Sequence, residues 1–229
     1  VLSGTVAFGD SINTGALTVG GSVTLAANSL LNVISGLTLS GVVSGTLGLL
    51  KIGGAELTLS GLNTYSGSTN VSAGSLTLSG GSAVSNASMV TIGSAASVKL
   101  VTSEEIGGLA GFGSVNLQAN VLTIGSSSVS TTYSGSLYGT GGSLVKSGSS
   151  VLTLLGASAY TGGTDLSAGA IRLGSNTAIG TGAVVFRGGT LSSDAAAART
   201  LSNVLTLSGT LTFGDAVANG TLTLGGVTT

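Results

Sequence analysis

The chain alternates apolar and polar residues in short bursts, and the bursts recur about every 20 residues. A typical burst is a Leu-Thr-Leu triplet, with apolar first and third side chains and a polar middle one. Because successive side chains on a β-strand point to opposite faces, both aliphatic groups of a triplet face a core while the middle residue faces solvent. Such triplets or their close variants occur at residues 17–19, 37–39, 57–59, 76–78, 152–154, 171–173, 191–192 and 211–213.

A fixed period with one short strand in each repeat is typical of a solenoid, in which each period forms one coil. Ser-Gly or Gly-Gly follows almost every triplet, which marks a corner of the coil. We therefore predict an all-β fold, a single parallel β-helix with about 20 residues per coil and roughly eleven coils. At a strand spacing of about 4.8 Å, these coils form a rod on the order of 50 Å long.

Two internal stretches repeat each other without a gap at a shift of 95 residues. The aligned pairs include Lys51 with Lys146, and Tyr65 with Tyr160. We expect the two lysines to lie at an edge of the rod. We take residues 48–80 and 142–175 as the two repeat units.

The two ends of the chain also repeat each other. Residues 2–21 align with residues 207–226 at a shift of 205 residues and without a gap. The chain thus restarts its own beginning, so we predict that residues 1–229 form one β-helical domain that is a segment of a longer array.

Two regions interrupt the period. Residues 79–109 are rich in Ser and Ala, and we expect a less regular coil there, with Glu104 and Glu105 on a solvated loop. Residues 193–200 contain a run of alanines, and we expect a protruding loop there, either one helical turn or an extended segment.

Composition agrees with a regular fold that has many corners. Glycine accounts for 41 of the 229 residues and proline is absent, yet 42% of residues are hydrophobic, too many for a chain that cannot bury a core. The mean hydropathy is +0.64, but Gly and Ser interrupt every apolar run before the roughly 18–20 residues that a membrane-spanning helix needs. A net charge of −1 gives no electrostatic footprint for nucleic acid.

The residue types that common catalytic sites need are scarce. Histidine and cysteine are absent, which removes His- and Cys-based nucleophiles and most metal ligands. We expect no enzymatic activity, no catalytic residue, no metal site and no cofactor. The carboxylates are scattered, at Asp10, Glu56, Glu104, Glu105, Asp165, Asp194 and Asp215.

Four residues are candidates for a ligand-binding or self-association surface. Asp165 and Arg172 lie near one another on consecutive predicted strands, although the first unit has other polar residues at both places, which favours a solvent-facing decoration. Tyr65 and Tyr160 occupy equivalent positions in the two units. Their rings either stack on carbohydrate or pack over a corner of the coil, and packing is the more common use of a repeated aromatic residue.

The first unit reads GLLKIGGAELTLSGLNTYSGSTNVSAGSL at residues 48–76, and it resembles the passenger-associated repeat of bacterial autotransporters. Residues 144–173 carry the same pattern, with Ser158 and Ala159 departing from the first unit at a corner. The resemblance implies a right-handed parallel β-helix on the outer surface of a Gram-negative-type cell. It also implies an outer-membrane barrel elsewhere in the full protein, which would be the chain's link to a membrane.

We therefore predict an extracellular structural or adhesive module of a secreted bacterial surface protein. The expected partners are copies of itself or neighbouring repeats, and host or matrix glycans, but not nucleic acid. An alternative is a β-helix that binds or cleaves polysaccharide with carboxylates that cluster only in three dimensions. A third is an ice-binding solenoid, for which a single threonine column is available at Thr18, Thr38, Thr58 and Thr77.

Overall fold

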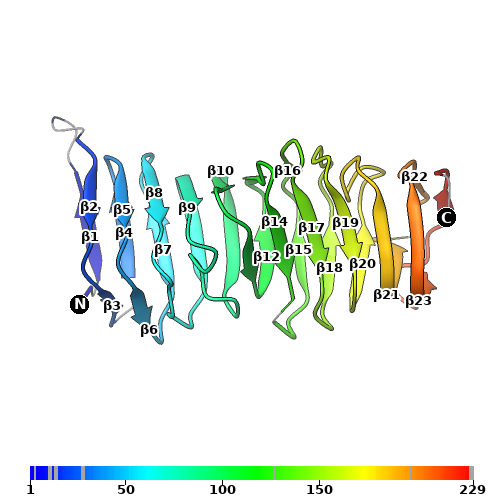
Figure 1. Ribbon diagram of the computed structural model, residues 1–229, viewed down its shortest axis with the longest axis horizontal. Coiled ribbons are helices and arrows are strands. Elements are labelled where there is room, and N and C mark those ends of the chain that lie inside the picture. Colours follow the sequence, from blue (N-terminus) through cyan, green and yellow to red (C-terminus); the bar gives the residue numbers. More distant parts are fainter. Residues whose placement is uncertain are drawn as a thin grey trace.

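The computed structural model describes residues 1–2, 4–9, 12, 15–26, 29–125, 127–195 and 197–226. These residues form parallel β-strands and no helix, so none of them lies in a helix that could cross a membrane. The strands stack into a rod with the two termini at opposite ends (Figure 1). The rod is a β-solenoid of about ten turns, which confirms the predicted all-β, parallel, coiled architecture.

Each turn passes through three stacks of strands, which we call the first, second and third faces. The long strands β9 (Thr69–Leu78), β10 (Met89–Leu100), β21 (Val184–Ser193) and β23 (Leu205–Phe213) bend around a corner and contribute to two faces each. The first face is the most complete and contains β1 (Thr5–Phe8), β4 (Ser29–Val33), β7 (Leu49–Ile52), β9 (Thr69–Leu78), β10 (Met89–Leu100), β12 (Gly108–Gly111), β15 (Thr131–Tyr133), β18 (Val151–Leu154), β20 (Ala170–Leu173), β21 (Val184–Ser193) and β23 (Leu205–Phe213).

The other two faces follow in chain order within each turn. The second face contains β2 (Leu17–Val19), β5 (Leu37–Leu39), β8 (Glu56–Leu59), parts of β9 and β10, β13 (Ser114–Asn116), β16 (Leu137–Tyr138) and, near the C-terminus, β22 (Arg199–Leu201) and β24 (Leu222–Leu224). The third face contains β3 (Val23–Leu25), β6 (Val43–Gly45), β11 (Glu104–Ile106), β14 (Val121–Ile124), β17 (Ser143–Lys146), β19 (Gly163–Leu166) and parts of β21 and β23.

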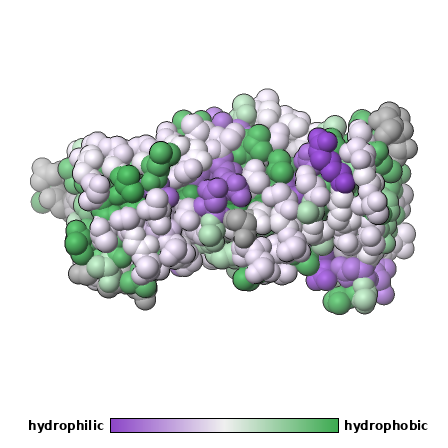
Figure 2. Space-filling view, turned by 60° about the horizontal axis from the view of Figure 1, so that its bottom comes forward, coloured by the Kyte–Doolittle hydropathy of each residue, from purple (hydrophilic) through white to green (hydrophobic). Residues whose placement is uncertain are grey.

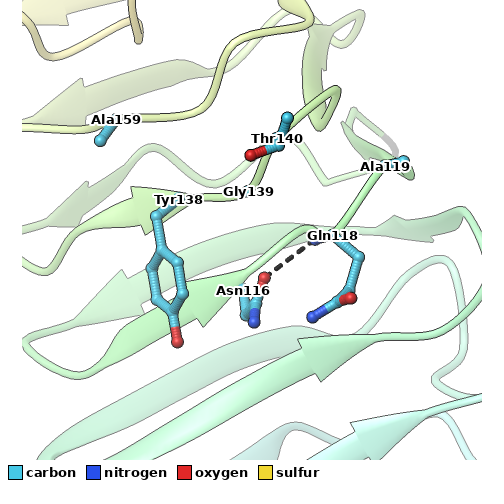
Figure 3. Close-up of a pocket in the computed structure, with 7 residues that line it drawn as sticks. All are labelled: Asn116, Gln118, Ala119, Tyr138, Gly139, Thr140 and Ala159. Atoms are coloured by element: carbon cyan, nitrogen blue, oxygen red, sulfur yellow. Dashed lines mark hydrogen bonds between the residues drawn. The ribbon is translucent and has the colours of Figure 1, made fainter.

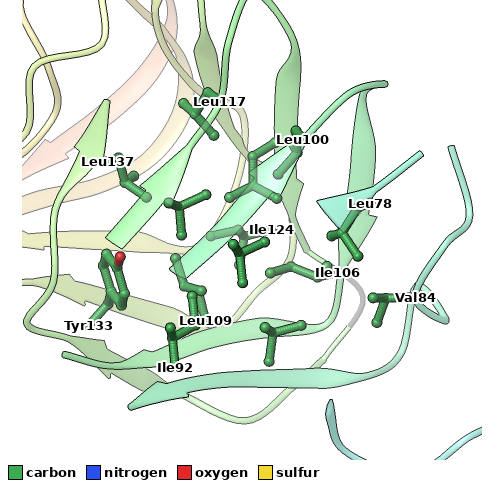
Figure 4. Close-up of a cluster of buried hydrophobic side chains, with 14 of the residues drawn as sticks. Leu78, Val84, Ile92, Leu100, Ile106, Leu109, Leu117, Ile124, Tyr133 and Leu137 are labelled. Carbon is green, nitrogen blue, oxygen red and sulfur yellow. The ribbon is translucent and has the colours of Figure 1, made fainter. Parts of the chain in front are cut away.

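The register of these stacks confirms the central sequence prediction. Leu17, Leu37 and Leu57 pair in successive layers of the second face, with the middle threonines also in register. In β5, Leu37 and Leu39 are buried while Thr38 is half-buried and faces outward. The inward residues form aliphatic columns that fill the axis of the rod (Figure 4).

The two sequence repeats relate differently to the turns of the solenoid. Lys51 lies in β7 on the first face, whereas its equivalent Lys146 lies in β17 on the third face. Five turns after β7, the first face is reached again at β18, and β17 is the strand just before it. A shift of 95 residues therefore covers five turns less one face. The shift of 205 residues instead carries β1 onto the C-terminal part of β23, which is on the same face ten pairings later.

The two regions that interrupt the sequence period contain both strands and irregular segments. The region 79–109 contains the twelve-residue strand β10, with bends and a turn within residues 80–87 and further bends at residues 101, 102 and 107. In the region 193–200, the described residues contain no helical turn, and the last two belong to β22. Ala196 lies outside the described residues.

Candidate functional site

Tyr65 and Tyr160 do not form part of an exposed surface. Both side chains are 0% exposed. The Tyr65 hydroxyl lies 2.7 Å from Thr69 Oγ1, and the Tyr160 hydroxyl lies 2.5 Å from Thr164 Oγ1. Burial raises the pKa of both phenols. The rings therefore have no face to offer a carbohydrate and instead fill equivalent corners of the core.

The solenoid separates Asp165 and Arg172 instead of pairing them. Asp165 lies in β19 on the third face, and Arg172 lies in β20 on the first face. Asp165 accepts from Arg187 at 2.7 Å, and Arg172 donates to Asp215 at 2.8 Å. Consecutive strands in this fold belong to different faces, which is why closeness in the sequence did not bring the two together.

Asp215 is the most strongly held of these carboxylates. Burial alone would raise its pKa, but hydrogen bonds from Arg172, from the backbone of Ala218 and Val217, and from the Ser192 hydroxyl lower the pKa to about 2. The carboxylate stabilises the local turn at the C-terminal end of the rod, and its oxygens already accept hydrogen bonds from these donors.

The two repeated lysines are buried in the core and do not lie at the rod edge that we expected. Both side chains are 0% exposed. Lys51 Nζ donates to the carbonyl oxygens of Gly53 at 2.7 Å and Ala73 at 2.8 Å, which belong to successive turns. Lys146 Nζ donates to the equivalent carbonyl of Gly148. Each lysine thus lies inside the rod and donates hydrogen bonds to backbone carbonyl oxygens at a corner. The alternation of apolar and polar residues in the sequence does not reveal such a buried lysine.

We expect the stability of the protein to rise between about pH 8 and pH 10. Burial lowers the pKa of Lys51 and Lys146 from 10.5 to about 8. In this window the folded state has released protons that the unfolded state still binds, so the free energy of unfolding increases with pH. Above about pH 10 the trend reverses, because burial raises the pKa of the interior tyrosines and the unfolded chain ionises first.

Urea midpoints measured across this window test the expectation. The double variant Lys51→Met and Lys146→Met should lose the rise, whatever its absolute stability. A midpoint of the native chain that is flat or falls between about pH 8 and pH 10 would contradict the role of the buried lysines.

Glu104 is also buried, contrary to the solvated loop that we expected. It is 3% exposed in β11, and one oxygen accepts from the Val84 backbone N–H at 2.8 Å. Burial raises the pKa of this carboxyl, and the backbone hydrogen bonds oppose that rise. Its neighbour Glu105 points outward and accepts from Asn86 at 3.1 Å, so the two carboxylates do face opposite sides.

A polar side chain supports the corner after each repeated Leu-Thr-Leu triplet. Asn63 Oδ1 accepts from the Val43 N–H at 2.7 Å, and Ser158 Oγ accepts from the Leu137 N–H at 3.2 Å. The substitution of serine for asparagine between the units therefore keeps the acceptor. This explains why the repeat tolerates that departure.

The outward positions of the second face form one column along the rod. The column begins with threonines, of which the fourth, Thr77, is buried and bonded to Glu56. A flat threonine surface is thus short, which does not favour ice binding. In register order the column is Thr18, Thr38, Thr58, Thr77, Lys99, Asn116 and Tyr138.

The end of this column borders an open hollow on the surface of the rod. Tyr138 is 40% exposed and pairs in register with Asn116. Figure 3 shows Asn116 between the side chains of Tyr138 and Gln118, with Thr140 and Ala159 further along the hollow. The Gln118 backbone N–H donates to Asn116 Oδ1 at 3.0 Å. None of the candidate residues predicted from the sequence belongs to this group. The strand register that continues the Thr77 column leads to Tyr138.

The remaining outer surface carries few charges. Figure 2 shows a mostly pale face with small, separate patches of strongly hydrophilic residues. Asp194 pairs with Arg199 at 2.8 Å, which makes a third Asp–Arg pair. Among the described residues there is no group of three metal-ligating side chains. Asp10 lies outside the described residues.

Comparisons with known proteins point to one class of surface protein. Residues 49–78 and 144–173 match the model of the passenger-associated-transport-repeat family. A 105-residue part of the chain is 48% identical to the adhesin BmaC autotransporter of Brucella suis biovar 1 (strain 1330). The match covers 45% of this chain and 3% of that relative. The chain thus spans a small fraction of the length of the curated relative that it matches.

Proposed function

We propose that this chain, which carries two passenger-associated transport repeats in a parallel β-solenoid, is a rigid section of the passenger of a secreted bacterial adhesin. The observation that carries the proposal is the uninterrupted first face, in which each strand bonds to the next over the length of the rod. Such a section would hold the adhesin away from the cell and keep its outer faces in fixed positions.

Local chemistry supports a structural use of the interior. The inward columns are aliphatic, and the buried polar groups of the two units form hydrogen bonds at the corners within the rod. Interiors packed in this way are stiff and transmit strain. The charged surface groups are few, so side-by-side contact between rods depends little on salt.

The 205-residue repeat favours an array of similar coils. Residues 2–21 recur as residues 207–226 without a gap. Because each coil of a solenoid contacts only its neighbours, coils of the same kind can stack on one another, whether within one long chain or between copies.

Polysaccharide cleavage has less support. Three of the described aspartates are held by arginines, and Glu104 is buried. Cleavage by a carboxylate pair needs two carboxyl groups that face one substrate groove. We therefore favour a role in building and presenting a surface over a role in catalysis.

A deletion that preserves the turns of the solenoid tests this proposal in the full-length parent on its own cells. Removing residues 5–209 joins Gly4 to Thr210, which continues on the first face in place of Thr5. We expect the shortened protein to remain on the surface, accessible to antibody on intact cells, with fibres about 50 Å shorter in electron micrographs. Absence of the intact parent from the surface, or a deletion with unchanged fibre length, would contradict the proposal.

A further inference from the structure

We infer that the hollow beside Tyr138 is a glycan-binding site, which deepens the proposed surface function and rests on it. Of the four tyrosines, Tyr65, Tyr133 and Tyr160 are fully buried, whereas Tyr138 is 40% exposed on an outward position. A half-exposed aromatic ring on a face made mostly of small polar residues leaves part of its apolar surface open to a ligand. It can cover the apolar C–H face of a sugar ring.

The polar groups beside the ring suit the hydroxyls of a saccharide. Within the described part of the chain, the side-chain amide of Gln118, the hydroxyl of Thr140 and the Asn116 Nδ2 group have no hydrogen-bond partner. Asn116 Oδ1, in contrast, is held by the Gln118 N–H. This contact orients the Asn116 side chain before any ligand arrives, which lowers the entropic cost of binding.

The backbone of the hollow supports this arrangement. Gln118 has a φ of +53°, in the left-handed region that residues other than glycine seldom adopt. The hydrogen bond from its N–H to Asn116 stabilises this turn and projects both amide side chains to the same side (Figure 3). Unusual backbone conformations of this type are often found at binding sites.

Charge extends the site along the rod. Lys99 is exposed and pairs in register with Asn116, one strand away from it and two from Tyr138. The residues that line the hollow include no carboxylate. A saccharide that lies along the column would therefore place a ring on Tyr138 and a sugar carboxylate near Lys99. The site should accept neutral sugars and prefer those with a uronic acid.

Titration of the complete chain with two defined oligosaccharides tests the inference. The probes are a hyaluronan hexasaccharide, which carries uronic acids, and the neutral cellohexaose, with binding followed by NMR shifts of the Asn116, Gln118 and Tyr138 amides. We expect dissociation constants in the millimolar range or tighter, with hyaluronan bound more tightly. Lys99→Met should remove the preference for hyaluronan and leave cellohexaose binding unchanged.

Matched variants distinguish binding at this site from non-specific binding of sugars to exposed aromatic rings. Tyr138→Ala should weaken binding of both probes at least tenfold, Tyr138→Phe should retain it, and Phe112→Ala, which removes an aromatic ring that is 70% exposed elsewhere, should have no effect. Absence of binding at millimolar concentration, or equal binding by Tyr138→Ala, would overturn the inference. If surface display and fibre length still behave as proposed, the glycan site alone is wrong and the structural role stands.

Discussion

Replacing Tyr65 with alanine should lower the free energy of unfolding by about 3–5 kcal/mol, the range typical of a large aromatic removed from a core. The ring is fully buried, and its hydroxyl bonds to the buried Thr69, so the variant leaves a cavity and removes one of the two hydroxyl partners of Thr69, the other being Ser88. Tyr160→Ala should have an effect of similar size, because Tyr160 bonds to Thr164 in the same way. Urea unfolding followed by circular dichroism measures both.

Tyr138→Ala is the matched control for these variants. It removes the same side chain from an exposed position, and surface substitutions of this kind usually change stability by no more than about 0.5 kcal/mol. Equal losses at Tyr65 and Tyr138 would contradict the assignment of Tyr65 to the core.

The second large effect is expected at two equivalent glycines, each of which stacks, from the next turn, on the corner that a repeated lysine supports. Gly169 has a φ of +72°, and a Cβ added there would lie 2.1 Å from the Gly148 carbonyl oxygen, the acceptor of Lys146. Gly169→Ala therefore combines backbone strain with overpacking and should cost about 3 kcal/mol. Gly74, its equivalent in the first unit, has a φ of +68° and the same crowding by backbone carbonyls. Alanine there should be comparably destabilising.

Gly54→Ala provides the control within the same corner. A Cβ at Gly54 meets nothing within 4 Å, and the second unit already carries serine at the equivalent position 149. We expect a change of no more than about 0.5 kcal/mol in thermal or urea unfolding. A loss at Gly54 as large as that at Gly169 would show that the corner itself, and not the crowded Cβ, limits substitution.

The fold was predictable because one physical signal was repeated many times. Alternation in the Leu-Thr-Leu triplets fixed the inward and outward positions, and their spacing fixed the coil, as the pairing of Leu17, Leu37 and Leu57 confirms. Which face a strand occupies was not predictable from the period. The triplets of the first half lie on the second face, whereas those that start at Leu152 lie on the first face.

The candidate surface was less predictable, because residue type is a weak guide to burial in this fold. Sequence reasoning places the Lys51 ammonium group at an edge of the rod and leaves Tyr65 between a surface and a corner, but each polar group reaches a partner inside the corner. Glu104 is buried for a related reason, since its carboxylate stands in for a backbone acceptor. Tyr138 lies outside both units, so it carried no repeat signal and became visible only through its register with Asn116.

The 205-residue period has a consequence for avidity. Because that period closes a whole number of turns, successive periods in a tandem array would return each strand to the same face of the solenoid. Hollows equivalent to that at Tyr138 would then recur on the same face, roughly 48 Å apart along the rod. A long polymeric ligand could engage several at once, and millimolar contacts would add up to durable attachment.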